Sequence, residues 1–468
     1  MAQSLQTSAN AMAAPAATFE SGMRPVLLAT AVTAIGGFLF GYDTAVISGA
    51  IGFIQSHFDL SPLQTGWAGA SAIVGCIPGA AFAGFLSDRF GRKRVLVLCG
   101  VLFALSGIGS AIPRTFGQFI AARFVGGLGI GASSMICPVY IAEIAPRRHR
   151  GRLGALFQLG IVLGIFLVFF VNLLIERMGD ANWNAHAGWR WMLGSEAIPA
   201  MAFLLLLIPI PESPRWLALH GRADESRRLL NGLVGPAAAE QELGAIASAS
   251  AAGPEQGRFR ELLGHGVRRP LLIAVALAAF SQFSGINAIM YYAPEVFKAA
   301  GGSLDSAFAS AVWVGLVNFV FTFVAIAWVD RAGRKPLLLI GTAVQTLSLL
   351  AVGWMFHRHN QGAGVLAGVL VFVAAFAMAM GPIPWILISE IFPSRVRGRA
   401  AALGTLVIWL ACYLVAQTFP MLQQGIGPAL TFCVYAGCSL LSFLFVAAMI
   451  PETKGRSLEE IEASWRRQ

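Results

Sequence analysis

Charged side chains are scarce in this chain: they make up 12% of its 468 residues, whereas 57% are hydrophobic. Soluble globular domains carry about 25% charged residues, so the composition excludes an ordinary water-soluble fold. The apolar residues also come in long runs, and a helix needs about 20 of them to cross a bilayer core of about 30 Å. We therefore predict an all-helical membrane protein.

Motifs for metal binding, redox chemistry and secretion are missing as well. The six cysteines form no C-x-x-C pair, and the seven histidines form no H-E-x-x-H pattern. Residues 1–23 contain no Lys or Arg, unlike the start of a secretory signal, and we expect a disordered tail there. With no nucleophile–base set and no phosphate-binding loop, we expect no enzyme activity, no cofactor and no metal. No Asn-x-Ser/Thr sequon occurs, which favours a bacterial inner membrane over an animal plasma membrane.

Twelve apolar stretches are long enough to cross a membrane. They begin near positions 25, 64, 94, 117, 152, 189, 269, 306, 336, 363, 399 and 427. Of the 33 Lys and Arg residues, 27 lie before the first stretch, in the loops after even-numbered stretches, or in the C-terminal tail. Positive residues stay in the cytoplasm, so both termini are predicted to be cytoplasmic. This placement also accounts for the net charge of +10 without any nucleic-acid partner.

Three motifs occur twice, in the same order. Asp88-Arg-Phe-Gly-Arg-Lys93 returns as Asp330-Arg-Ala-Gly-Arg-Lys335, Glu143-x-x-Pro-x-x-x-Arg-Gly-Arg152 returns as Glu390-x-x-Pro-x-x-x-Arg-Gly-Arg399, and Pro211-Glu-Ser213 is echoed by Pro451-Glu-Thr453. Parallel repeats of six helices with a site between them are an architecture of transporters. We expect a tail (1–24), a six-helix bundle (25–211), a cytoplasmic helical linker (212–268), a second bundle (269–450) and a second tail (451–468).

The same motifs resemble those of a known family. Gly84-Phe-Leu-Ser-Asp-Arg-Phe-Gly-Arg-Lys93 is similar to the loop 2–3 signature of the major facilitator superfamily. Gly188-Trp-Arg-Trp-Met192, Pro211-Glu-Ser-Pro-Arg-Trp216 and Pro451-Glu-Thr-Lys-Gly-Arg456 resemble the sugar porter family within it, including bacterial xylose/hexose–proton symporters and facilitative glucose transporters. The resemblance spans residues 25–460 or so. It implies a twelve-helix major facilitator fold and a secondary active transporter that imports a hexose or pentose by alternating access. The implied partners are the sugar, a proton and the lipid bilayer, with the monomer as the working unit.

An acid and a base lie deep inside two of the apolar stretches. Asp43 lies in the middle of the first stretch, where a charge is costly unless it faces the bundle interior. Arg123 lies inside the fourth. An Asp and an Arg match these positions in proton-coupled sugar porters, whereas facilitative animal glucose transporters have Asn in place of the Asp. The resemblance therefore implies that the pair couples transport to a proton; the alternative is a static pair that packs two helices.

Sugar recognition needs amides for hydroxyl groups and aromatic faces for the ring. Gln282 and Asn287 flank a glycine, and Trp385 ends a Gly/Pro-rich stretch; interrupted helices at mid-membrane are typical of transporter sites. With the positions that the family resemblance adds, the predicted site residues are Phe40, Thr44, Gln158, Ser281, Gln282, Asn287, Tyr291, Tyr292, Asn318, Trp385, Ile408 and Trp409. The alternative for each amide is a hydrogen bond between helices.

The chain departs from the family at three of these places. Ser281 and Ile408 stand where the family often has an amide, and Cys412 stands at a further Asn position. The departures leave the identity of the sugar open.

Charges of both signs cluster at the helix ends predicted to face the cytoplasm. In the family, residues at these motif positions form a network that holds the inner side closed. Exposed ion pairs contribute about 0–1 kcal/mol each, so substrate binding can tip the balance of several. Anchoring at the membrane edge is the alternative. The predicted gate residues are Arg92, Glu143, Arg150, Glu212, Asp330, Arg334, Glu390 and Arg397.

Three other functions stay open at this point. Within transport, the chain could be a facilitative sugar uniporter or a porter of a polyol such as inositol. Outside transport, it could be a sugar sensor that binds its ligand without moving it. Sensors of this kind usually carry long cytoplasmic extensions, whereas the tail here spans only 451–468.

Overall fold

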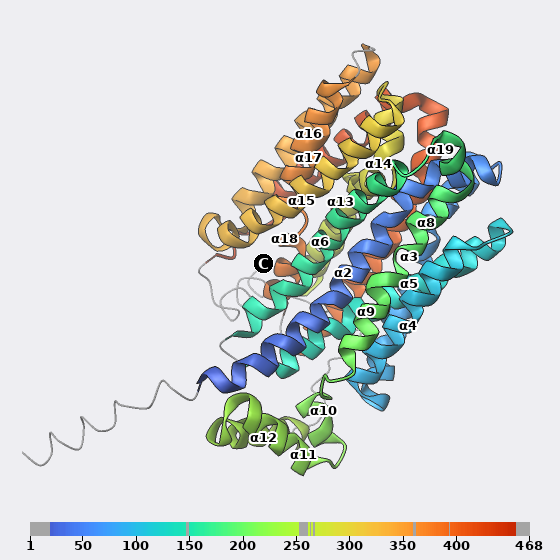
Figure 1. The fold of residues 1–468 in the computed structure, drawn as a ribbon. Helices are drawn as coiled ribbons and strands as arrows, with labels where there is room; N and C mark the ends of the chain where they lie inside the picture. Colours follow the sequence, from blue (N-terminus) through green and yellow to red (C-terminus); the bar gives the residue numbers. More distant parts are fainter. Residues whose placement is uncertain are drawn as a thin grey trace, which may run out of the picture.

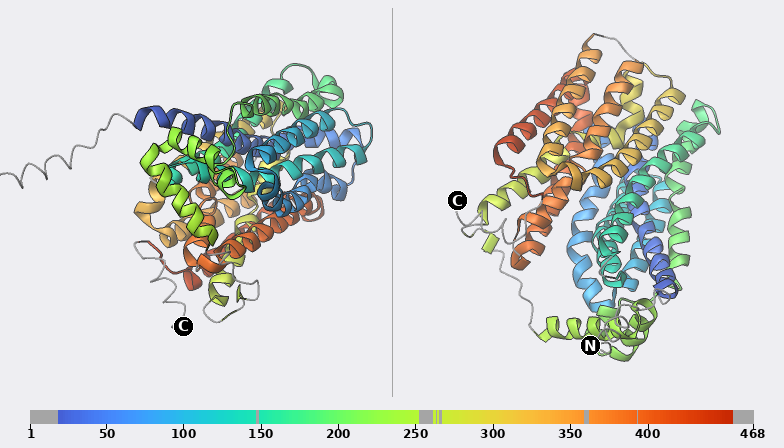
Figure 2. Two further views of the ribbon diagram at one scale, coloured as in Figure 1. Left: turned by 90° about the horizontal axis from the view of Figure 1, so that it is seen from below. Right: turned by 90° about the vertical axis from the view of Figure 1, so that its left-hand side faces the viewer.

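The computed structural model describes residues 19–454, except 147–148, 252–260, 263, 265–266, 359–361 and 393. Every regular element in this part of the chain is a helix. Two groups of long helices, α2–α9 and α13–α19, lie side by side, and the short helices α10–α12 form a separate group at one end (Figures 1 and 2). We call this end the linker end. The predicted tails 1–24 and 451–468 lie largely outside the described residues.

The first half has five long helices and a sixth crossing assembled from short pieces. The long helices are α2 (Phe19–His57), α3 (Pro62–Phe90), α4 (Arg92–Ala111), α5 (Phe116–Ile144) and α6 (Arg150–Glu176). The pieces are α7 (Ala181–Trp183), a π-helical turn (Asn184–Gly188), α8 (Trp189–Gly194) and α9 (Ala197–Leu207). This crossing begins at Ala181 rather than near 189, because Asp180 caps the helix there by accepting from the Trp183 amide at 2.8 Å.

The linker forms the short helices that its composition predicts, α10 (Pro214–Leu219), α11 (Ala223–Val234) and α12 (Pro236–Ala251). Two hydrogen bonds fix its start to the first half. Trp216 Nε1 donates to the Asp88 carbonyl at 2.9 Å, and the Tyr140 hydroxyl donates to the Pro211 carbonyl at 2.6 Å. The linker helices are therefore attached to the ends of α3 and α5.

The second half contains interrupted helices. Its elements are α13 (Arg268–Phe283), α14 (Ile286–Ala299), α15 (Leu304–Ala332), α16 (Arg334–His357), α17 (Ala363–Met378), α18 (Ile383–Ile391) and α19 (Ser394–Met449). α13 and α14 are one crossing broken at Gly285, whose φ of 87° is accessible to glycine without strain. α17 and α18 are likewise one crossing, broken around Gly381. Both predicted interruptions are confirmed.

α19 contains two crossings. Its 56 residues would extend about 84 Å as a straight helix, nearly three times the bilayer core of about 30 Å. Gly427, with φ 81° and ψ 162°, breaks the helix. The eleven long apolar helices of the described residues thus contain the twelve predicted crossings.

The two halves meet from the middle of the bundle to the end opposite the linker. At that end Arg177 Nε and Asp305 Oδ1 form an ion pair at 2.5 Å, and Gln417 Nε2 donates to the Leu63 carbonyl at 2.8 Å. Rings also stack between the halves nearer the middle, as Phe166 does on Phe319 at 6.1 Å. The structure is therefore closed at the end opposite the linker.

Candidate transport site

Asp43 and Arg123 form an ion pair in the interior of the first half, as the sequence predicts. Their side chains are 0% and 1% exposed. Arg123 Nη1 donates to Asp43 Oδ1, and Nη2 donates to the Asp43 carbonyl at 2.9 Å. A buried ion needs a partner, and loss of one partner leaves an uncompensated charge. The pair therefore depends on both members.

A second acid, Glu196, lies beside the Asp43–Arg123 ion pair. It was not among the predicted site residues. It lies between α8 and α9, is 1% exposed, and its carboxyl lies within hydrogen-bond reach of the Asp43 carboxyl. Asp43 Oδ2 and Glu196 Oε1 have no donor among the described protein groups. Ionised carboxylates only accept, so a hydrogen bond between two carboxyls requires a proton on one of them. We call Asp43, Arg123 and Glu196 the proton-holding group.

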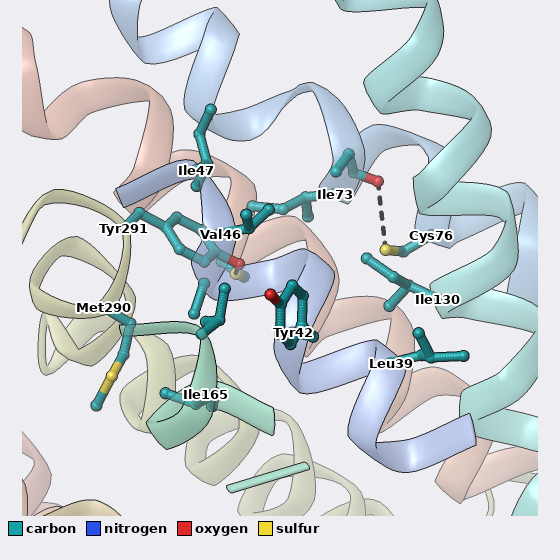
Figure 3. Close-up of a cluster of buried hydrophobic side chains, with 14 of the residues drawn as sticks. Leu39, Tyr42, Val46, Ile47, Ile73, Cys76, Ile130, Ile165, Met290 and Tyr291 are labelled. Atoms are coloured by element: carbon teal, nitrogen blue, oxygen red, sulfur yellow. Dashed lines mark hydrogen bonds between the residues drawn. The ribbon is translucent and has the colours of Figure 1, made fainter. Parts of the chain in front are cut away.

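An aromatic and apolar layer surrounds this level of α2. The Tyr42 hydroxyl lies 2.8 Å from Ser195 Oγ, next to Glu196 in the chain. Figure 3 shows Tyr42 and Val46 on α2, with Tyr291 reaching toward them from α14 and Cys76 and Ile130 on the other side. Such a layer excludes water and strengthens the electrostatic contacts inside it.

In the second half, the side chains around the Gly285 break bond to one another. Gln282 Nε2 donates to Ser281 Oγ at 3.0 Å, and Asn287 Nδ2 donates to Gln282 Oε1 at 2.5 Å and to Cys412 Sγ at 3.1 Å. The Tyr291 hydroxyl lies 3.7 Å from the same sulfur. We call these five residues the amide group. It includes two of the three places where the chain departs from its family.

A small cavity lies between the two groups. Its volume is about 10 Å³, and its walls include Thr44 and Arg123 from the first half and Tyr291 and Trp409 from the second. That is about the space for one water molecule. Phe40 lies nearby, with its ring 5.8 Å from that of Trp409. Four predicted sugar-site residues and a member of the proton-holding group therefore meet at the junction of the halves.

Besides Phe40, five predicted site residues belong neither to the amide group nor to the walls of the cavity. Gln158 is exposed on α6, Trp385 is 45% exposed on α18, and Asn318 is buried on α15. The Tyr292 hydroxyl donates to the carbonyls of Ala416 and Thr65 at 3.0 and 3.5 Å. In this structure Tyr292 thus ties α14 to α19 and α3. Ile408 is nearly buried beside Trp409 in the chain.

The charges at the linker end of the first half pair with one another. Arg92 donates to the Glu143 carboxylate from Nε and Nη2, at 2.9 and 3.0 Å. Glu212 accepts from the backbone amides of Arg92 and Lys93 at 2.8 and 3.2 Å. These amides begin α4, where a helix has unpaired donors and favours an anion. Gly91, with φ 99°, makes room for this carboxylate, because a Cβ there would collide with it.

The second half repeats this arrangement. Arg334 Nη2 donates to Glu390 at 2.9 Å, and Glu452 accepts from the amides of Arg334 and Lys335 at 3.1 Å each. Gly333, with φ 91°, takes the place of Gly91.

Arg150 and Arg397 also correspond. Each donates from Nε to the backbone carbonyl five residues earlier, at 3.1 and 3.3 Å. The side chain of Asp330 lies outside the described part. The printed contacts of the described gate residues thus form two sets, one in each half, and Arg150 also contacts Glu242 of the linker at 3.4 Å. We call them the inner charge sets.

Comparison with known proteins agrees with these features. The family profile described as "Sugar (and other) transporter" matches residues 29–465. The arabinose-proton symporter of Bacillus subtilis (strain 168) is 42% identical over 441 residues, covering 94% of this chain and 95% of the relative. The D-xylose-proton symporter of Escherichia coli (strain K12) is 41% identical over 468 residues, covering 93% and 95%.

A solved structure shows the same fold. The inward-open conformation of the xylose transporter from E. coli matches with a TM-score of 0.84 at 39% identity, covering 93% of this chain and 99% of that one. Its likeness extends over both halves, as does that of the relatives. The chain therefore belongs to the sugar transporter family and is a multi-pass membrane protein with the twelve-helix major facilitator fold.

Proposed function

We propose that this transporter imports a pentose or hexose together with a proton, by alternating access. The observation that carries the proposal is the meeting of the proton-holding group and predicted sugar-site residues at one small cavity. The names of the two relatives above, symporters of arabinose and of xylose with a proton, support it.

The proton is held by the two acids. When both are ionised, two negative charges share one guanidinium in a buried site, and the net charge is costly to bury. A proton on either carboxyl balances the site. Since Arg123 also lines the cavity beside Tyr291 and Trp409, a change in its pairing alters a wall that the sugar site shares. Protonation and sugar binding then favour each other by the same factor, as linkage requires.

The sugar replaces hydrogen bonds within the amide group by its own. Gln282 and Asn287 satisfy each other in this structure, so a sugar hydroxyl exchanges partners with them and gains a net 0.5–1.5 kcal/mol or so per bond. Trp409 and Phe40 offer aromatic faces for the C–H side of the ring. The site thus recognises a neutral polyhydroxyl ligand.

We place the linker end and both termini in the cytoplasm of a bacterial cell, because 27 of the 33 Lys and Arg residues fall on that side. The opposite end, where Arg177 pairs with Asp305, then faces outward and is closed here. Opening it requires these contacts to break while the inner charge sets of the two halves come together. We propose that a single chain completes this cycle.

Uptake into proteoliposomes tests the proposal. Purified transporter is reconstituted and given labelled arabinose, xylose or glucose, with and without an inward proton gradient. Symport predicts accumulation above the outside concentration only with the gradient, and its loss on adding a protonophore. Uptake that merely equilibrates in both conditions indicates a uniporter. Binding without uptake of any sugar indicates a sensor.

A phosphatase fusion tests the orientation. An enzyme that needs the periplasm, fused after Gln468, is expected to be inactive in a bacterial host. Strong activity would invert the proposed orientation.

A further inference from the structure

Ser106 on α4 is buried, and its hydroxyl makes no hydrogen bond within its own helix. It is 0% exposed, and its hydroxyl bonds to no described protein group. Some buried serines donate to the carbonyl three residues earlier, as Ser71 does to Ala68 at 3.1 Å and Ser133 to Ile130 at 3.0 Å, whereas Ser110 on the same helix is unpartnered like Ser106. A buried hydroxyl without a partner costs free energy, so its position calls for an explanation.

Ser106 borders the proton-holding group. A Cβ added to Gly126 on α5 would come closer than 3.0 Å both to Ser106 Oγ and to Asp43 Oδ2. Two oxygens that border one such point lie within reach of each other, directly or through one water. Asp43 Oδ2 is the oxygen that Arg123 leaves without a donor. A donor without an acceptor therefore adjoins an acceptor without a donor.

α4 is held close to both acids by glycines. Gly107, next to Ser106, packs on Glu196, where a Cβ would lie 3.2 Å from that of Glu196. Gly126 and Gly107 together let α4 approach α5 and the turn before α9. Ser106 is thus part of a tightly packed wall, and its hydroxyl stays beside the carboxyls.

We infer that Ser106 is a positioning residue for proton release: it donates to Asp43 when the carboxyl pair gives up its proton. The inference rests on the proposed proton symport. In the protonated state the two acids share a proton, and Ser106 is not needed. When that proton leaves to water, the Ser106 O–H turns to the new carboxylate. No bond to carbon or sulfur changes, and the released proton passes to solvent.

Hydrogen bonds to an ionised acceptor are stronger than those to a neutral one. Ser106 therefore lowers the proton affinity of the pair and eases release into the cell. The other titratable and charged groups that face this site are Tyr42 on α2, Cys76 on α3, Arg123 on α5, Glu196 before α9 and Tyr291 on α14. A substitution at Ser106 leaves the chemical identity of all these groups unchanged.

The test is the pH profile of sugar-driven proton uptake in proteoliposomes, with D-xylose and L-arabinose as probes. Ser106→Ala is expected to raise the proton affinity about tenfold, the effect of losing one hydrogen bond to a charge. The alkaline limb of the profile then moves up by about one pH unit. Ser106→Thr keeps the hydroxyl and should restore the wild-type midpoint.

Ser110→Ala is the matched control. Ser110 lies one turn along α4, is 1% exposed and is equally unpartnered, but the atoms nearest a Cβ at Gly126 belong to Ser106 and Asp43 and not to Ser110. Its profile should match the wild type. A Ser106→Ala midpoint equal to wild type, or an equal shift in Ser110→Ala, overturns the inference. So does a loss of rate at every pH with an unmoved midpoint, because that is a structural effect. If the wild type itself shows no proton uptake, it is the proposed symport that fails.

Discussion

The two halves repeat the same contacts at the linker end but bury different kinds of side chain in their interiors. At the linker end each half forms the same set of contacts, Arg92 with Glu143 in the first and Arg334 with Glu390 in the second. In the interior the halves diverge. Apart from Arg92 at the linker end, the buried charged side chains of the described residues are Asp43, Arg123, Glu176 and Glu196, all in the first half. The second half buries the uncharged amides Gln282, Asn318, Gln345 and Gln417 and no charged side chain among its described residues, whereas the first half buries the amides Asn172 and Asn184 beside its charges.

Under the proposed function, this difference places the proton in the first half and most hydrogen bonds to the sugar in the second. A proton needs ionisable groups in a dry setting, whereas a neutral sugar needs donors and acceptors that do not repel it. If the proton site and the sugar site lay in the same half, a change of charge would directly alter the electrostatic environment of the sugar-binding amides. Here the two sets of residues meet at the cavity lined by Arg123, Tyr291 and Trp409. Substitutions can therefore separate coupling from recognition.

The largest expected effect comes from removing the buried cation. Arg123→Ala leaves two acids without a partner, and breaking a buried pair costs about 3–5 kcal/mol. We expect a markedly lower melting temperature for the purified transporter and loss of both uphill uptake and exchange. Arg177→Ala is the control, since its ion pair with Asp305 is 53% exposed on both sides and such pairs contribute about 0–1 kcal/mol. Equal melting of the two variants would contradict a buried, charged first half.

The second prediction separates the two halves by function. Asp43→Asn mimics the protonated acid, so we expect uphill accumulation to vanish while exchange of labelled for unlabelled sugar continues. Gln282→Ala, in the amide group, should weaken both modes together, by about tenfold in apparent affinity for one or two lost hydrogen bonds. Gln345→Ala is the control, because Gln345 is a buried amide on α16 outside the amide group. If Asp43→Asn still concentrates sugar, proton coupling lies elsewhere.

The sequence predicts the Asp43–Arg123 contact because opposite charges in apolar stretches must find each other. Glu196 carries the same signal, because it is an acid in the apolar stretch that starts near 189, and the sequence therefore contains the information needed to place it with the pair. The partners inside the amide group could not be predicted, because amides of this kind can bond to a ligand, to another helix or to each other. The separation of the inner charge sets depends on which state of the cycle is present, and one sequence encodes all states.

The third prediction compares the two ends. Each inner charge set is expected to help close the inner side when the halves come together. Glu390→Ala removes a carboxylate partner of Arg334 and should favour the inward-open state by about 1 kcal/mol, roughly fivefold in population. Arg177→Ala should act in the opposite direction, since it weakens the closed outer end. A cysteine placed at the exposed Gln158 reports both changes through its rate of labelling by a polar maleimide. Unchanged rates in Glu390→Ala would favour anchoring at the membrane edge.

The smallest expected effect concerns selectivity within the second half. Cys412 accepts from Asn287 at 3.1 Å, but a thiol is a weak acceptor, so this side of the site holds a ligand hydroxyl poorly. A site with fewer amides on one side discriminates less between sugars that differ there, because no buried donor is left unpaired when a hydroxyl is missing. Cys412→Asn restores the amide. We expect the preference among pentoses, hexoses and deoxyhexoses to sharpen by about tenfold at most, the value of one hydrogen bond.

Competition of such a panel against one labelled sugar measures that preference, and Cys412→Ala separates the two roles of the residue. The alanine variant loses the sulfur without gaining an amide, so its ranking of competitors should stay as flat as that of the wild type. Asp43 is untouched in both variants, and the accumulation ratio at a given proton gradient should therefore stay the same. If Cys412→Asn leaves the ranking unchanged, α19 does not present this position to the sugar. If it changes the accumulation ratio instead, recognition and coupling are not divided between the halves as their buried side chains indicate.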